Sequence, residues 1–341
     1  MVLAIILFVL LGFSVLFNIG SFFSQLGHMG GLQTRRTVGP RLDEVMLEDN
    51  DASAKIAVVP IEGIITGQMI DRSGFNMVDI VKAQLKRADE DSKVKAVLLR
   101  VDSPGGEVLA SDEISKAIEK FQDESGKPVI VSMGSLAASG GYYVSAPCRW
   151  IVANELTITG SIGVIMSTWN YRGLMDKVGV RPFTFKSGKF KDMLSGSRVP
   201  DDITQEEKDM VQKLIDETYE RFKTVVADGR KHSHEENEKN GKALAANWTD
   251  YADGRVLSGK EAHDLGFVDE LGNLDVAARR ARTIAGIKRA DLVEYRQRVD
   301  LADLLGLFGR SESRAIKVDI GVESPKVEAD RMYFLSPTYL R

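Results

Sequence analysis

The chain has 341 residues, 43% of them hydrophobic and 28% charged, so it is long enough to bury a sizeable core. Its 45 Lys and Arg against 49 Asp and Glu leave a formal net charge of −4, so nothing in the charge suggests nucleic-acid binding, which would call for a basic stripe. A single cysteine, Cys148, excludes an intrachain disulfide.

The N-terminal segment is strongly apolar. Residues 1–34 contain no Asp, Glu, Lys or Arg, and the stretch 2–19 approaches the roughly 20 residues that span a hydrocarbon core as a helix. We expect residues 1–27 to form a single-pass transmembrane anchor. A cleaved signal peptide is the alternative. Such a peptide has basic residues at its N-terminus and a cleavage site of small residues, and neither is clear in this sequence. The first basic residues, Arg35 and Arg36, follow the span, and the positive-inside rule alone would place them in the cytoplasm.

Residues 28–54 have no clear period and are predicted to be a linker. After them, runs rich in β-branched residues alternate with amphipathic helical patterns. Strands are expected at 55–65, 95–101, 128–133, 150–153 and 160–165, and helices at 76–89, 107–121 and 142–146. Strands that alternate with helices predict an α/β domain with crossover connections.

The second half of the chain is predicted to be mainly helical. A long helix is expected over 204–230, because Thr204 with Glu207 three residues later is a capping signature. The other expected elements are a strand at 183–185, a helix at 259–265, a strand and turn at 266–272 and a helix at 274–285. The main domain is therefore expected to span 55–290, with 291–341 as a C-terminal extension.

Two glycine turns each follow an expected strand and precede an expected helix, at Pro104–Gly106 and Ser139–Gly141. A helix start leaves backbone N–H groups unpaired, and glycine lets such a backbone approach a ligand closely. If the turns lie side by side, Ser139 could attack a carbonyl while the N–H groups of Gly106 and Gly140 hold the developing oxyanion. Taken by itself, either motif could instead be an ordinary turn between a strand and a helix.

A serine nucleophile needs a base. The histidines are expected to be solvated or distant; they are His28, His232, His234 and His263. A lysine serves as base only where burial or charge lowers its pKa far below about 10.4. Lys191 is the preferred candidate and Lys189 the reserve, and the alternative is that both are solvated. Ser161 is a candidate hydroxyl to orient the lysine, although a plain strand-edge serine is an equal alternative.

Five motifs, taken in order, resemble the signal peptide peptidase A family, the short bacterial membrane serine proteases of the protease IV type. They are Asp102–Gly106, Ala137–Tyr143, Thr159–Gly163, Ser187–Asp192 and Ala252–Gly259. The resemblance runs from about residue 55 to residue 280. It implies an α/β, ClpP/crotonase-like fold with an N-terminal transmembrane helix, and catalysis by a Ser–Lys dyad without metal or cofactor.

Motif by motif, the resemblance implies a role for each candidate residue. Ser139 resembles the nucleophile and Lys191 the general base. Gly106 and Gly140 resemble the oxyanion donors, and Ser161 resembles the hydroxyl that orients the lysine. Whether Lys191 serves the Ser139 of its own chain or of a neighbouring subunit stays open.

The resemblance also implies a setting and a substrate. It predicts a serine endopeptidase of the cell membrane, with its catalytic domain outside the cytoplasm, that hydrolyses remnant signal peptides and other apolar peptides. It further predicts a homo-oligomeric ring. This sequence departs from the family in having no basic residue before the expected span, so its orientation is less well determined than its chemistry.

The C-terminal extension has two interpretations. Residues 315–322 alternate like an edge strand, and Met332–Leu335 is an isolated apolar tetrad. The tail is either a disordered end or an extended strand that docks in the substrate groove, of its own chain or of a neighbour, and restrains activity.

Two alternative functions share some of these features. A crotonase-type acyl-CoA enzyme has paired oxyanion turns, but it would need acidic catalytic residues where this chain has serine and glycine. A catalytically inactive membrane scaffold with a protease-like fold is the other alternative. The retention of both Ser139 and Lys191 in matching motifs argues against it.

Overall fold

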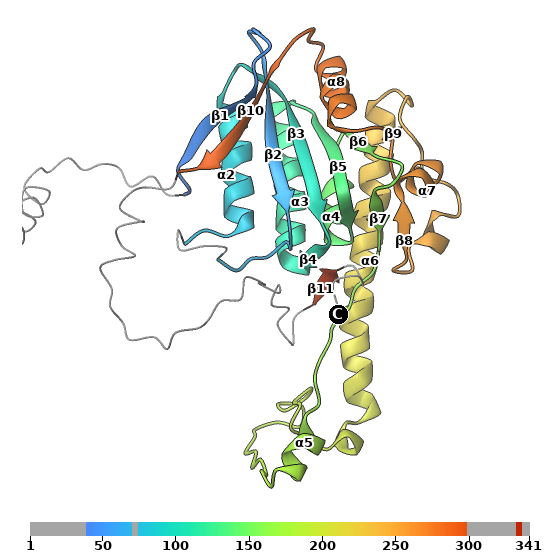
Figure 1. The fold of residues 1–341 in the computed structure, drawn as a ribbon. Coiled ribbons are helices and arrows are strands. Elements are labelled where there is room, and N and C mark those ends of the chain that lie inside the picture. Colours follow the sequence, from blue (N-terminus) through green and yellow to red (C-terminus); the bar gives the residue numbers. More distant parts are fainter. Residues whose placement is uncertain (1–38, 70–73, 299–331, 336–341) are drawn as a thin grey trace, which may run out of the picture. The chain divides into compact units, whose positions relative to one another are not determined.

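The structure is a computed structural model that describes residues 39–69, 74–298 and 332–335 (Figure 1). The transmembrane anchor expected at 1–27 and the edge strand expected at 315–322 lie outside the described residues. Within the part of the chain that is described, no helix combines the length and the apolar character that a membrane crossing requires.

A mostly parallel sheet forms the framework of the described residues. Seven of its nine strands run in the order β1-β10-β2-β3-β5-β6-β9, and β7 joins β5 on one side and β8 on the other. These strands are β1 (Leu42–Glu48), β2 (Lys55–Glu62), β3 (Val94–Ser103), β5 (Val129–Ala138), β6 (Trp150–Ala153), β7 (Ile158–Gly160), β8 (Val256–Ser258), β9 (Glu270–Leu271) and β10 (Asp291–Gln297). The pairs formed by β1 with β10 and by β7 with β8 are antiparallel, whereas the others are parallel. A separate two-stranded sheet contains β4 (Gly105–Glu107) and β11 (Tyr333–Leu335).

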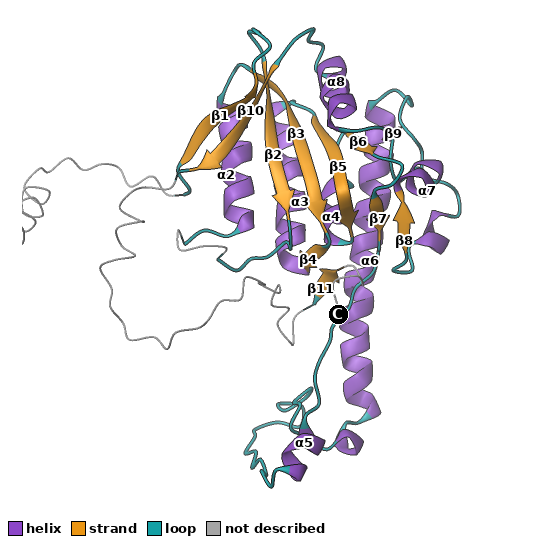
Figure 2. Ribbon diagram, in the orientation of Figure 1, coloured by secondary structure: helices purple, strands orange, loops and turns teal. Residues whose placement is uncertain are grey.

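Helices cover both faces of the sheet (Figure 2). One face packs against α2 (Met77–Glu90), α3 (Val108–Ser125), α4 (Gly140–Ser145) and part of α6 (Gln205–Glu236). The other face packs against α8 (Leu274–Ile284). The remaining helical elements are α5 (Arg172–Lys177), α7 (Gly259–Asp264) and the short 3₁₀ helices η1 (Pro200–Asp202) and η2 (Trp248–Tyr251).

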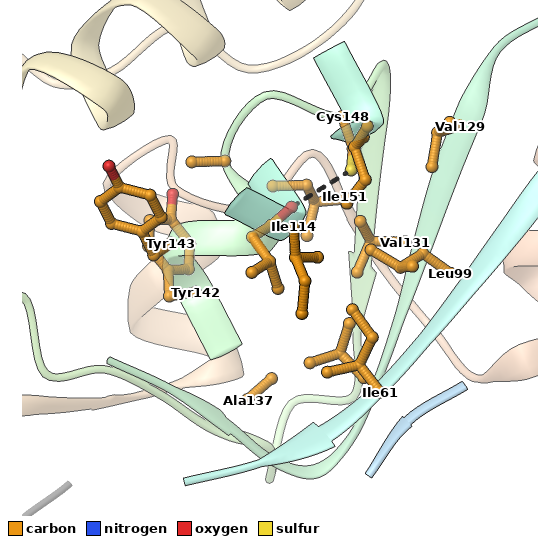
Figure 3. Packing of buried hydrophobic residues seen from close by; sticks show 14 of the residues in the cluster. Ile61, Leu99, Ile114, Val129, Val131, Ala137, Tyr142, Tyr143, Cys148 and Ile151 are labelled. Carbon is orange, nitrogen blue, oxygen red and sulfur yellow. Dashed lines mark hydrogen bonds between the residues drawn. The ribbon is translucent and has the colours of Figure 1, made fainter. Parts of the chain in front are cut away.

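The core follows from the alternation of side chains along each strand. In β2, Ala57 and Val59 face α2 and α3, whereas Ile56 and Val58 face α8. A parallel strand buried on both faces needs an unbroken apolar run, which is what β2, β3 and β5 supply. Figure 3 shows part of the larger cluster, where Ile114 of α3 and Tyr143 of α4 lie to one side of Val131 and Leu99.

Most predicted elements are confirmed within a few residues, but two predicted strands differ. The strand predicted at 183–185 is wrong: the segment is irregular, and Phe183 and Phe185 are 87% and 98% exposed. An extended segment becomes a strand only with a hydrogen-bonded neighbour, and this segment has none among the described residues. The strand predicted at 160–165 ends at Gly160, because Gly160 and Ser161 both have positive φ, which breaks the ladder.

The sheet also reaches beyond the range expected for the main domain. β1 lies in the segment expected to be a linker, and β10 lies at the start of the expected extension. β10 is parallel to β2 and antiparallel to β1, so it inserts between them. The sheet therefore begins before residue 55 and continues past residue 290.

Candidate active site

Three neighbouring strands end at one edge of the sheet, and the candidate residues follow them. β3 pairs with β5 so that Ser103 lies opposite Ala137, and β5 pairs with β7 so that Ala138 lies opposite Gly160. The carboxyl ends of parallel strands meet at the same edge, which is where sites form in α/β folds. The fold therefore brings together the two glycine turns and the serine motif that the sequence pattern singled out.

Ser139 occupies the turn between β5 and α4. Its φ is 54° and its ψ is −114°, in the positive-φ half of the map that non-glycine residues rarely adopt. Its N–H donates to the Gly160 carbonyl at 2.8 Å, and its carbonyl accepts from the Tyr143 N–H at 2.8 Å. The residue is 1% exposed, and its Oγ has no hydrogen-bond partner among the described residues. Backbone strain combined with a buried, unpaired hydroxyl is typical of a functional position.

The backbone N–H groups of Gly106 and Gly140 lie close together beside Ser139. A Cβ atom added to Gly140 would lie 3.1 Å from the Gly106 nitrogen, and one added to Gly105 would lie 2.6 Å from the Gly140 nitrogen. The fully buried Ser103 hydroxyl accepts a hydrogen bond from the Gly105 N–H at 3.1 Å and so braces the turn. Two neighbouring, fixed donors of this kind can stabilise an oxyanion.

Ser161 lies next to Ser139. Because Ala138 is opposite Gly160 in the ladder, the two serines continue from paired positions on β5 and β7. Ser161 is 3% exposed, and its N–H donates to the Arg255 carbonyl at 2.7 Å. The part that its hydroxyl plays in orienting a lysine stays a prediction.

Neither candidate lysine joins this cluster within one chain. Lys191 is exposed, and Lys189 is 65% exposed at its side chain and pairs with Glu206 at 2.5 Å. Both belong to the segment between β7 and α6 that also carries α5, and Figure 1 shows α5 at the far end of α6 from the sheet. Since Ser139 Oγ has no partner among the described residues, neither lysine of the same chain hydrogen-bonds to it. The pairing of Ser139 with Lys191 stays a prediction.

The C-terminal tetrad docks on the first glycine turn. β11 pairs antiparallel with β4, so that Phe334 lies opposite Gly106. On its other side, Tyr333 exchanges two backbone hydrogen bonds with Ile165, at 3.0 and 3.2 Å. The prediction that this tetrad docks as an extended strand is confirmed, and the docking partner is its own chain. Whether docking restrains activity stays a prediction.

Sequence reasoning missed an aromatic pocket at this edge. Tyr143 of α4 and Phe222 of α6 enclose the Phe334 ring, and all three residues are fully buried. The Tyr143 hydroxyl donates to Asp112 at 2.8 Å, and Lys116 pairs with the same carboxylate at 2.6 Å. The two consecutive tyrosines after the second glycine turn were a usable signal, but only the fold brings Phe222 to them.

The ionisation of this pocket follows from its burial. Burial raises the pKa of the Tyr143 hydroxyl, and its hydrogen bond to Asp112 raises the pKa further, so the hydroxyl stays a donor. Burial alone would raise the pKa of Asp112, but hydrogen bonds from Lys116 and Tyr143 outweigh it and lower that pKa. The pocket therefore has a neutral aromatic wall backed by a charged carboxylate.

A cleft of about 560 Å³ continues from the pocket between α3 and α6. Its lining combines apolar and charged side chains, among them Leu109, Asp112, Glu217, Arg221 and Met332. Leu109 is 68% exposed and contributes apolar surface to this lining. The cleft has room for side chains of an extended peptide that continues the line of β11.

The three histidines among the described residues take no part in the cluster at the strand ends. His232 and His234 both lie on α6. The His234 ring nitrogen lies 2.9 Å from the Gly241 carbonyl oxygen, and the His232 ring nitrogen lies 3.6 Å from the Glu236 carboxylate. His263 lies on α7. Across residues 39–69, 74–298 and 332–335, no group of three His, Cys, Asp or Glu side chains is arranged to hold a metal ion.

Comparison with known proteins identifies relatives of this chain. The model of peptidase family S49 matches residues 121–288. A Methanocaldococcus jannaschii protein provisionally named a protease is 41% identical over 65% of this chain and 65% of its own length. An Enterococcus faecium protein provisionally named signal peptide peptidase SppA is 37% identical over 75% of this chain and 71% of its own length. Protease 4 of Haemophilus influenzae is 34% identical over 73% of this chain, but the match spans only 38% of that longer protein.

Proposed function

Because this chain belongs to peptidase family S49, we propose that it is a serine endopeptidase with Ser139 as nucleophile and Lys191 as general base. The observation that carries the proposal is the buried, unpaired Ser139 Oγ beside the N–H groups of Gly106 and Gly140. The match to a peptidase family also argues against the acyl-CoA alternative.

The proposed reaction is acyl transfer through Ser139. The neutral amine of Lys191 removes the hydroxyl proton as Oγ bonds to the peptide carbonyl carbon. The carbonyl oxygen becomes an oxyanion, which the N–H groups of Gly106 and Gly140 stabilise. The lysine ammonium then protonates the leaving amine as the C–N bond breaks. A water molecule, deprotonated by the same amine, hydrolyses the acyl-serine ester and restores the free hydroxyl.

We propose that the lysine comes from a second copy of the chain in a homo-oligomeric ring. Within one chain, Ser139 Oγ is unpaired and Lys191 is exposed. The segment that carries Lys191 also exposes large apolar side chains, including Trp169 at 80% and Phe185 at 98%. Packing that segment on a neighbour would bury these rings and remove water from the lysine, which is the condition for an amine to act as a base.

The dyad is tested with the full-length chain in detergent and a fluorogenic apolar peptide. Ser139→Ala and Lys191→Ala are each expected to lower kcat by on the order of 10⁴-fold. Lys189→Ala, two residues away, is the matched comparison and is expected to keep activity. Loss of activity with Lys189→Ala but not with Lys191→Ala would assign the general base to Lys189. Activity that survives Ser139→Ala would rule out Ser139 as the nucleophile.

Sharing of the dyad between subunits has its own test. The two inactive variants, Ser139→Ala and Lys191→Ala, are mixed and reassembled from dissociated subunits. If the lysine acts on a neighbour, some interfaces combine an intact serine with an intact lysine, so part of the activity returns. No recovery in mixed assemblies, with both variants shown to be assembled, would place the dyad within one chain.

We further propose that the enzyme acts at the cell membrane, on remnant signal peptides and other apolar peptides. The apolar segment 1–27, which we expect to be a single-pass anchor, supports this setting. The name of the Enterococcus faecium relative supports the substrate class. The resemblance to the signal peptide peptidase A family supports a catalytic domain outside the cytoplasm. Cleavage of a signal peptide in vesicles that contain the full-length chain, against an equally long polar peptide, tests the substrate class.

A further inference from the structure

β11 lies in the candidate active site in the way that an extended substrate peptide would bind there. It lies between β4 and Ile165 and bonds to the backbone on both sides: Val108 N–H donates to the Met332 carbonyl at 3.3 Å, and Tyr333 pairs with Ile165. Backbone pairing of this kind accepts almost any sequence, because the hydrogen bonds come from the main chain. Side-chain pockets along the strand must therefore supply the selectivity.

The register identifies which residue of such a peptide meets the proposed oxyanion donors. Phe334 lies opposite Gly106. A Cβ atom added to Gly105 would lie 1.9 Å from the Phe334 carbonyl oxygen and 2.6 Å from the Gly140 nitrogen. The Phe334 carbonyl oxygen therefore lies close to the Gly140 backbone nitrogen. In a substrate of the same register, the carbonyl of the residue opposite Gly106 is the one that Ser139 would attack.

The side chain at this register position enters the aromatic pocket. The Phe334 ring stacks on Tyr143 with centroids 4.8 Å apart and planes 23° apart. It also meets Phe222, tilted by 53° at 4.6 Å. Stacked and tilted rings at these distances attract one another beyond the gain from burial alone. The pocket thus fits a flat ring better than a branched aliphatic side chain of similar size.

The pocket is held in one shape by polar contacts behind it. The Tyr143 hydroxyl donates to Asp112, which also accepts from Lys116 and lies 3.5 Å from Arg221. Tyr143 belongs to α4, the helix that begins directly after Ser139. The ring that would contact the substrate is therefore fixed relative to the nucleophile, which a selective pocket requires.

We propose that Tyr143 and Phe222 are specificity-determining residues that select an aromatic side chain on the residue whose carbonyl is attacked. This inference rests on the proposed peptidase function and names its preferred substrates: peptides with phenylalanine or another aromatic residue just before the cleaved bond. Burial of a phenylalanine side chain predicts a preference over alanine of about 10- to 100-fold in kcat/KM. Ring stacking adds a preference over leucine of about 2- to 10-fold.

The test uses three peptides that differ only at this position, with phenylalanine, leucine or alanine, and the full-length chain in detergent. Tyr143→Leu and Phe222→Leu are each expected to reduce the phenylalanine-over-leucine ratio to near unity. Tyr143→Phe keeps the ring but loses the hydrogen bond to Asp112, so its ratio is expected to lie between those of the unmodified chain and Tyr143→Leu. Equal cleavage of the three peptides by the unmodified chain, or equal losses on all three in the leucine variants, would overturn the inference.

A binding measurement separates failure of the inference from failure of the proposed function. The full-length Ser139→Ala chain also carries Phe334→Ala, so that the tail ring no longer fills the pocket. Fluorescence anisotropy of the labelled peptides is expected to show roughly 10-fold tighter binding for phenylalanine than for alanine. Adding Phe222→Leu should reduce the difference in affinity between the phenylalanine and alanine peptides. Equal binding of the two peptides would show that the pocket does not select an aromatic side chain, whether or not the chain cleaves any peptide.

Discussion

At the residue scale, Gly105 is a position where a single methyl group should disturb the proposed oxyanion donors. Its φ is 101°, which strains any other residue. An alanine Cβ would lie 2.6 Å from the Gly140 nitrogen and in the space where the Phe334 carbonyl now sits. We predict that Gly105→Ala lowers kcat by on the order of 100-fold or more, because a misplaced oxyanion donor costs that much. Steady-state kinetics on an apolar peptide, with a thermal melt of the same sample, checks the result.

Gly126 is the matched control for that change. It also has a positive φ, 66°, at the end of α3, but a Cβ there would meet nothing within 4 Å. Gly126→Ala should carry a similar backbone strain of about 1 kcal/mol and keep its activity. If both variants lose activity equally, the effect of Gly105→Ala is a general loss of stability and not a local block.

Single residues were predictable where a short motif ties them to a strand end. Ser139, Gly106 and Gly140 directly follow strands that the apolar runs already indicated, so pairing of those strands was enough to bring them together. Phe222 could not be predicted, because it is one of several apolar residues on a long helix and only tertiary packing selects it. The contact made by Lys191 could not be predicted either, since within one chain it does not reach Ser139.

At the element scale, one buried ion pair ties α6 to the sheet. Arg230 of α6 and Asp269, just before β9, are both fully buried and lie 2.5 Å apart. The same carboxylate accepts hydrogen bonds from the backbone N–H groups of Ile151 and Lys242. Asp269→Ala would leave a buried guanidinium without its partner, so we predict a loss of about 3–5 kcal/mol in the free energy of unfolding. Urea denaturation followed by fluorescence measures it.

An exposed pair provides the comparison. Lys260 and Asp264 on α7 lie 2.8 Å apart with side chains 63% and 56% exposed. Asp264→Ala should leave the denaturation midpoint nearly unchanged, because solvent already screens this pair. Equal midpoint shifts in the two variants would mean that burial does not determine the strength of the Arg230 contact.

The start of α6 predicts a pH dependence. Hydrogen bonds from Arg198 and from the Thr204 N–H lower the pKa of Glu207 from 4.5 to about 2. Since the folded-state pKa is depressed, the stabilising effect is fully present above about pH 4.5 and is lost as the pH falls towards 2. Glu207→Gln should therefore lower Tm at pH 7 and flatten the fall of Tm below pH 4.5. Glu206→Gln, at the neighbouring position, should keep the unmodified slope.

Elements were predictable where local pattern and tertiary context agree. The capping signature at Thr204 correctly marked the start of α6, and the apolar runs marked β2, β3, β5 and β6. The strand expected at 183–185 failed because its aromatic residues meet no neighbouring strand. The polar, weakly periodic residues of β1 gave no strand signal, since that strand lies at the sheet edge with most side chains exposed.

At the scale of the whole molecule, two distant parts of the chain meet at one groove. β4 follows the third strand of the chain, whereas β11 lies near the C-terminus, yet they form a sheet of their own. The sequence indicated an apolar tetrad there but could not show which edge it joins, because backbone pairing carries little sequence information. The register with Gly106 is what connects the tail to the proposed chemistry.

That connection predicts that the tail competes with substrate. β11 fills the line between β4 and Ile165, and the Phe334 ring fills the pocket, so a substrate must displace both. If the groove is free about a tenth of the time, deletion of residues 332–341 should raise kcat/KM on a phenylalanine peptide about 10-fold. Deletion of 336–341 alone keeps β11 and should leave the rate unchanged. Equal rates for both truncations and the full chain would mean that the tail occupies the groove for only a small fraction of the time, and therefore exerts no restraint.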